Sequence, residues 1–261
     1  MIAKETRADR WAVVVGLLVL ALRLQSAITT DLHTQSVTAL AYNFDADFSA
    51  VTAGHISTGA AYLWATFFSD LTLYLLVGIG GAIFGAGLIA SEASSGSIYV
   101  LLSRPMSRTR ILLTKYGVAA GLSLLLCMLF GAISFSVGAW QGVESPPLGG
   151  WALSVLLLWL GMLFVIGVAM LYSVLVPSAL AAGVLAFFTV YVLDIAPVFH
   201  SGTGSNVQYF LGGPPWQLSA YWSSLGIYAG AESPVKSLVI ATVAAGIPVA
   251  LAVVLFVRKA Y

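Results

Sequence analysis

The stretch that decides the fold is Trp151–Val176, which reads WALSVLLLWLGMLFVIGVAMLYSVLV and holds no charged side chain. A helix needs about 20 mainly apolar residues to cross the hydrocarbon core of a bilayer. The rest of the chain has the same character, because 60% of its 261 residues are hydrophobic and 8% are charged. With 11 basic and 10 acidic residues, the chain cannot cover a water-soluble surface of this size. The composition therefore excludes a soluble enzyme and predicts an integral membrane protein.

Six stretches are long and apolar enough to span a membrane. They are rich in Leu, Val, Ala, Ile and Gly without a two-residue alternation, which predicts helices and not barrel strands. The fold class is therefore all-α, a single transmembrane domain over residues 1–261. The predicted spans are Trp11–Thr30, a span starting between Ala60 and Leu71 and ending near Ala90, Ile111–Ala139, Trp151–Val176, Ser178–Pro197 and Ser237–Val257.

The basic residues orient this bundle. With six spans both termini lie on one side, and the positive-inside rule makes that side the cytoplasm of a cell-membrane protein. Only Arg23 and Lys236 then lie on or near the outer side, while these residues face inward: Lys4, Arg7, Arg10, Arg104, Arg108, Arg110, Lys115, Arg258 and Lys259. A cleaved signal peptide is the alternative for the first span, since basic residues precede it. The length of that apolar run favours a span.

Three segments between the spans are more than plain connectors. Residues 31–58 form a long polar outer segment, and residues 198–236 form an outer segment rich in aromatics, glycine and proline. The second is interpreted as short helices at the outer interface, or as a solvated loop whose aromatics pack on the bundle. The third, residues 91–110, is cytoplasmic. It predicts a short amphipathic helix that starts near Ser97, ends at Pro105 and meets lipid or a protein partner through one apolar face, Ile98, Tyr99, Leu101 and Leu102.

This cytoplasmic segment carries a family resemblance. It reads Glu92-x-x-x-Gly96-Ser97-Ile98-x-x-Leu101-Leu102-Ser103-Arg104-Pro105-x-Ser107-Arg108-x-x-Ile111-Leu112-Leu113-x-Lys115. The pattern resembles the signature of ABC transporter permeases of the type 2 exporter class. The resemblance implies a six-span half-transporter with an interfacial elbow helix at residues 1–10. It also implies a second permease copy, as a homodimer or a related heterodimer, and a separate ATPase subunit.

The resemblance assigns 92–105 as the coupling helix, which would sit in a cleft of that ATPase. Glu92 is expected just before the helix start, where a carboxylate meets exposed backbone amides. Gly96 provides a position without a side chain, for a tight turn or for close approach of the partner. Tyr99 and Leu102 would plug the cleft from one side of the helix. The ATPase-coupling set is Glu92, Gly96, Ser97, Tyr99, Leu102, Arg104, Pro105 and Arg108, with the two arginines contacting the ATPase or anionic lipid.

Cofactor and catalytic roles are not expected of this chain. It has no Gly-x-x-x-x-Gly-Lys-Ser/Thr phosphate loop, so ATP and Mg would be held by the partner subunit. No catalytic motif is present, and the chain is not expected to be an enzyme by itself. Metal binding is not expected either, because His33, His55 and His200 are isolated, and Cys127 reads as an inert buried thiol. A net charge of +1 gives no reason to expect nucleic-acid binding.

The apolar spans contain a few unusual positions. Arg23 lies about 18 Å along a helix from Trp11, beyond the membrane midplane. It is expected to snorkel outward or to pair with Asp70 or Asp194, and a polar substrate or proton path is the alternative. Gly81 and Gly85 form a small-xxx-small pair that would serve either a dimer or packing within the chain.

Three functions are compatible with these features. The first is the membrane subunit of an ATP-driven exporter, for which the cargo stays open among drugs, peptides, lipids and polysaccharides. The second is a member of the same family that transmits force without moving a substrate. The third, from another class, is a membrane assembly factor whose basic inner loop binds lipid.

Overall fold

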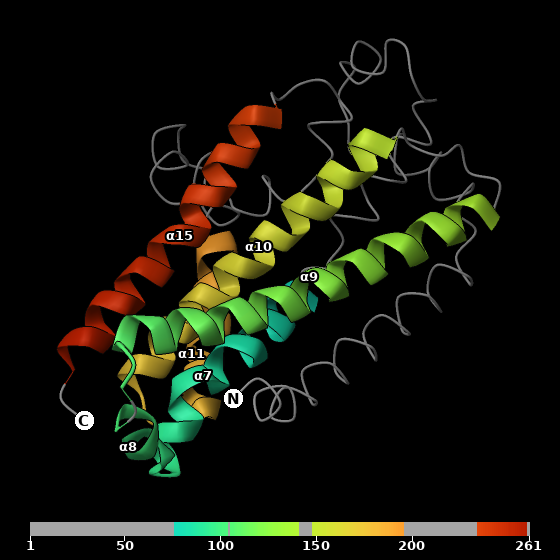
Figure 1. The fold of residues 1–261 in the computed structure, drawn as a ribbon. Helices are drawn as coiled ribbons and strands as arrows, with labels where there is room; N and C mark the ends of the chain where they lie inside the picture. The colour runs from blue at the N-terminus through green and yellow to red at the C-terminus, as the bar shows by residue number, and fades with distance from the viewer. Residues whose placement is uncertain (1–75, 104, 141–147, 196–233, 260–261) are drawn as a thin grey trace, which may run out of the picture.

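A computed structural model describes residues 76–103, 105–140, 148–195 and 234–259 of the chain. Within these ranges all regular secondary structure is helical, with no strand (Figure 1). This confirms the all-α prediction for the described part of the chain. The elements in order are the π-helix η1 (Leu76–Gly80) and the α-helices α7 (Gly81–Ser94), α8 (Ser97–Leu102), α9 (Arg108–Trp140), α10 (Leu148–Leu175), α11 (Ala179–Ile195) and α15 (Pro234–Arg258).

Four of the described helical stretches are long and apolar enough to cross a membrane. They are Val77–Ser94, Arg108–Ile133, Trp151–Leu175 and Leu238–Arg258, which correspond to the predicted second, third, fourth and sixth spans. The predicted fifth span is the 17-residue helix α11, whose apolar stretch Ala179–Val190 is shorter. The predicted first span, the elbow segment, the outer segment 31–58 and most of the outer segment 198–236 lie outside the described residues, and residues 234–236 belong to the start of α15. The chain is thus a helical membrane protein with four candidate spans among its described residues, and the count of six for the whole chain stays a prediction.

Helix α10 is the centre of the described bundle. It contacts α7, α9, α11 and α15, and Figure 1 shows it running between α9 and α15. Its sequence is apolar all round, which is typical of a helix enclosed by other helices. Side chains from every side of α10 are accordingly buried, among them Leu157, Leu158, Met162, Ile166 and Met170.

Glycines allow the helices around α10 to approach it closely. A Cβ atom added to Gly85 on α7 would lie 2.4 Å from the carbonyl oxygen of Ile166, and one added to Gly81 would lie 2.8 Å from the Cβ of Val165. Both glycines therefore serve packing within the chain, which decides between the two roles considered for this pair. On the opposite side, Gly167 of α10 faces Pro248 of α15, where an added Cβ would lie 3.0 Å from the proline Cγ.

Most of the described helices begin or finish at the same end of the bundle. Helices α7, α10 and α15 finish there, whereas α9 begins there, and α11 begins four residues after α10 ends. Lys259, one residue past α15, donates from its Nζ to the carbonyl of Val174 at the end of α10. Helix α8 and the end of α15 lie at this same end in Figure 1. We call it the basic end, because it holds Arg108, Arg110, Lys115, Arg258 and Lys259.

Candidate functional site

The site begins at the turn that joins α7 to α8. Gly96 has a φ of 71°, a left-handed conformation that favours glycine. The turn is closed by backbone bonds from the Ser95 amide to the Ser91 carbonyl (3.2 Å) and from the Gly96 amide to the Ala93 carbonyl (3.3 Å). A Cβ added to Gly96 would meet nothing within 4 Å, so the described chain needs this glycine for its backbone conformation and not for a close contact.

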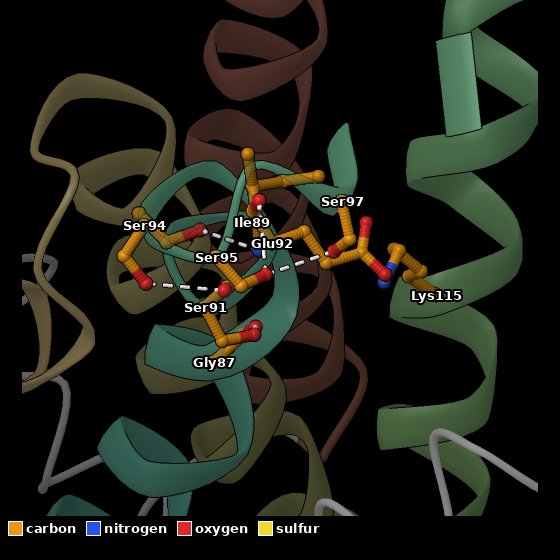
Figure 2. A network of polar contacts seen from close by, with 9 residues as sticks. Gly87, Ile89, Ser91, Glu92, Ser94, Ser95, Ser97 and Lys115 are labelled. Carbon is orange, nitrogen blue, oxygen red and sulfur yellow. Dashed lines mark hydrogen bonds and ion pairs between the residues drawn. The ribbon is translucent and has the colours of Figure 1, made fainter. Parts of the chain in front are cut away.

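Serine side chains surround this turn and satisfy its backbone carbonyls (Figure 2). The hydroxyl of Ser94 donates to the carbonyl of Ser91 (3.1 Å), and that of Ser95 donates to the carbonyl of Glu92 (3.3 Å). The hydroxyls of Ser95 and Ser97 lie 2.9 Å apart and share a hydrogen bond. Because the last carbonyls of a helix have no partner within it, these contacts complete the end of α7.

Helix α8 follows the turn and begins at Ser97, where the sequence predicts a helix start. The predicted single apolar face is wrong for Ile98 and Tyr99, because the first side chain is buried and the second is exposed. Ile98 points inward and is only 1% exposed, whereas Tyr99 is 63% and Val100 65% exposed. The side chains of Leu101 and Leu102 and all of Arg104 lie outside the described residues, and Pro105 is exposed just beyond the helix. Ile98 therefore anchors a short helix that presents Tyr99 and Val100 outward.

Glu92 is not located where the sequence analysis expects it. It lies in the last turn of α7 and not at the start of α8, because α7 continues to Ser94. Its Oε1 accepts a hydrogen bond from Nζ of Lys115 on α9, at 3.0 Å. The Lys115 side chain is 1% exposed and that of Glu92 is 11% exposed. The carboxylate therefore binds a second helix of this chain and does not meet the amides of α8.

The second carboxylate oxygen of Glu92 is buried and has no hydrogen-bond partner among the described residues. Sequence reasoning missed this ion pair, although both residues belong to the quoted motif. They are separated by 23 positions and lie on different helices. No spacing rule along the chain predicts contact between Glu92 and Lys115. The sequence indicated only that each is a charged residue next to an apolar span.

Arg108 makes contacts within the chain. Its guanidinium Nη1 donates to the carbonyl of Lys259 (2.5 Å) and lies 3.5 Å from that of Val257. An arginine at this position satisfies carbonyls at the end of α15 and interacts favourably with the negative end of the helix dipole. The expected contact of Arg108 with an ATPase or with lipid stays a prediction.

The remaining candidate residues contribute little to this site. Arg23 and Asp70 lie outside the described residues, and Asp194 lies near the end of α11 with a side chain that is not described, so their pairing stays a prediction. Cys127 is a free, buried thiol, as the sequence predicts. Across the described ranges, no group of three or more His, Cys, Asp or Glu residues is placed to hold a metal ion.

Comparison with known proteins places almost the whole described chain within one family. A family model described as "Protein of unknown function (DUF2705)" matches residues 29–258. The Bacillus subtilis (strain 168) protein described as "Uncharacterized protein YhcI" is similar, at 35% identity over 72 residues. That alignment covers 27% of this chain and 23% of the relative, so the likeness extends over about a quarter of each.

Proposed function

Because the chain belongs to the DUF2705 family, whose description states no function, we propose one from the geometry of α8 and the basic end. The chain is the membrane permease subunit of an ATP-binding-cassette exporter. It works with a second permease copy and with a separate ATPase subunit that holds ATP and Mg.

The observation that carries this proposal is the exposure of α8. A six-residue helix is not stable by itself in water, so it needs an anchor, and Ile98 supplies one. Tyr99 and Val100 nevertheless stay exposed beside each other at the bundle end that carries the basic residues. Tyrosine is among the residue types that most often carry the binding energy of a protein interface. Both residues lie inside the segment that resembles the coupling helix of type 2 exporters, at two positions that the motif leaves open.

The proposed mechanism follows from the connections of α8. Closure of two ATPase subunits on ATP would displace α8, which is joined to α7 through the Gly96 turn and to α9 through residues 103–107. Helix α7 packs closely on α10 through Gly81 and Gly85, so a displacement of its end moves the bundle and not an isolated loop. The resulting rocking of two permease copies would open a path for the cargo.

The test is purification of the tagged chain from its native membrane, followed by identification of its partners. We expect a protein with a Gly-x-x-x-x-Gly-Lys-Ser/Thr loop to co-purify in equal amount and to hydrolyse ATP. Tyr99→Ala should lower its retention at least about tenfold, as expected for an interface aromatic. Phe188→Ala is the matched control, because Phe188 is also an exposed aromatic but lies on α11.

Three outcomes would contradict the proposal in different ways. If a stable, folded chain co-purifies with no such ATPase, the exporter role is wrong and a membrane assembly factor becomes the better interpretation. If the ATPase binds and is coupled equally well to the Tyr99→Ala variant, the contact lies elsewhere. An ATPase that turns over without any transported cargo would favour the force-transmitting member of the family.

A further inference from the structure

The ion pair between Glu92 and Lys115 closes a loop of chain around α8. The loop leaves the last turn of α7 at Glu92, passes through α8 and returns along α9 to Lys115. Figure 2 shows the Lys115 side chain reaching from α9 to the carboxylate, beside the serines of the α7–α8 turn. Lys115 lies seven residues into α9, about 10 Å along its axis. The ion pair therefore joins α7 to α9, the helices that precede and follow α8, at positions inside each helix and not in the turns that connect them to α8.

The stability of the fold alone does not explain this ion pair. Burying two charges costs several kcal/mol, and apolar residues of similar volume often stabilise as well or better. The arrangement also leaves one Glu92 oxygen buried without a hydrogen bond among the described residues, which adds a desolvation penalty. What a charged pair provides and an apolar contact does not is a defined geometry, because the hydrogen bond fixes both distance and direction.

The other attachments of α8 leave that geometry undetermined. Ile98 is the buried anchor among the described α8 side chains, and an apolar contact of one residue does not fix an orientation. A Cβ added to Gly96 in the turn would meet nothing within 4 Å, so no neighbouring element packs on that side of the glycine. Packing on α10 and α15 keeps α7 and α9 in place, but without the ion pair their ends lose a directional link across α8, and α8 could tilt.

We propose that Glu92 and Lys115 are positioning residues, whose ion pair holds α7 and α9 in register so that a displacement of α8 is delivered to both helices together. The force-transmitting part of this inference rests on the proposed function. The positioning part concerns the chain by itself.

The test uses variants that separate positioning from stability. Lys115→Met removes the described partner of the buried Glu92 carboxylate, and Glu92→Met removes the carboxylate from Lys115, whereas the double variant E92M/K115M replaces the pair by apolar side chains of similar volume. Arg110→Met is the matched control, because Arg110 is an exposed cation in the first turn of the same helix. Folding yield in detergent reports stability, and amide hydrogen exchange of residues 97–103 in the purified chain reports the order of α8.

We expect both single variants to lower the yield and the double variant to restore it. Exchange over residues 97–103 should be about tenfold faster than in the wild type for Lys115→Met and for the double variant, and unchanged for Arg110→Met. In the complex with the ATPase, the double variant should bind normally but lose cargo-coupled hydrolysis.

A double variant that regains both the yield and the slow exchange of the wild type would overturn the inference, since the pair would then serve stability only. Unchanged exchange in Lys115→Met would overturn it as well. The exchange measurement needs no partner, so a failure of the exporter role would appear as absence of an ATPase, whereas a failure of the positioning role would appear in the chain alone.

Discussion

The closest described approach between α7 and α10 gives a sharp test of how this bundle is packed. At Gly85, an added Cβ would lie 2.4 Å from the carbonyl oxygen of Ile166 and 2.6 Å from the Cβ of Ala169. Both distances fall about 1 Å or more short of an ordinary van der Waals contact. Since the carbonyl belongs to a helix backbone, it cannot rotate away as a flexible side chain would. The Gly85→Ala variant must therefore push α7 and α10 apart.

The magnitude follows from two opposing effects. Overpacking of this kind costs up to about 3 kcal/mol. Alanine is favoured over glycine in a helix by about 1 kcal/mol, which offsets part of the loss. We expect Gly85→Ala to lower the free energy of unfolding by about 2 kcal/mol.

Gly87 provides the matched control, because it lies two residues further along α7 and a Cβ added there would meet nothing within 4 Å. Gly87→Ala should keep the wild-type stability or raise it by up to about 1 kcal/mol. Titration with SDS in mixed micelles, followed by tryptophan fluorescence, to which Trp151 and Trp159 at the α9–α10 contact contribute, measures both variants. Equal effects of the two substitutions, or no loss for Gly85→Ala, would refute the packing described for this pair.

Two further predictions concern the α7–α8 turn and the orientation of the chain. Gly96→Ala should destabilise the turn by about 1–2 kcal/mol because of the positive φ of Gly96, and it should speed amide exchange in α8. Gly117→Ala is the control, because Gly117 is an exposed glycine of α9 with open space around it, and it should leave exchange in α8 unchanged. Equal exchange in the two variants would contradict this prediction. Single cysteines can be placed at Ser107 and Ser205 in a Cys127→Ala background. In intact cells, the cysteine at Ser107 should resist a membrane-impermeant thiol reagent and the cysteine at Ser205 should react. Labelling at Ser107 would show that the basic end faces outward.

The helices were predictable because their signal is local. Long apolar runs predict α9, α10 and α15 within three residues at either end, since a bilayer accepts few other structures for such segments. The start of α8 was predictable for a similar reason, because a glycine turn precedes Ser97. The end of α7 was harder to predict, because the apolar run ends near Ala90 whereas the helix continues to Ser94, where backbone and hydroxyl contacts at its last carbonyls complete it.

The site was predicted in its location but not in its contacts. The motif identified Glu92 and Arg108, yet their partners Lys115 and Lys259 depend on how the helices pack, which no spacing along the chain specifies. The roles of Gly81 and Gly85 were open for the same reason. A small-residue pair indicates close approach of a helix without indicating whether that helix belongs to the same chain or to another.

The enclosure of α10 has a consequence for how sequences of this family can diverge. A helix that touches four neighbours is closely packed at its buried positions, so residues such as Leu157, Met162 and Ile166 should vary only among residues of similar size. The outward face of α15, with Val239, Val243 and Ile247 exposed, needs only to be apolar toward lipid. Over evolutionary time α15 should therefore drift freely among aliphatic residues while α10 keeps its shape.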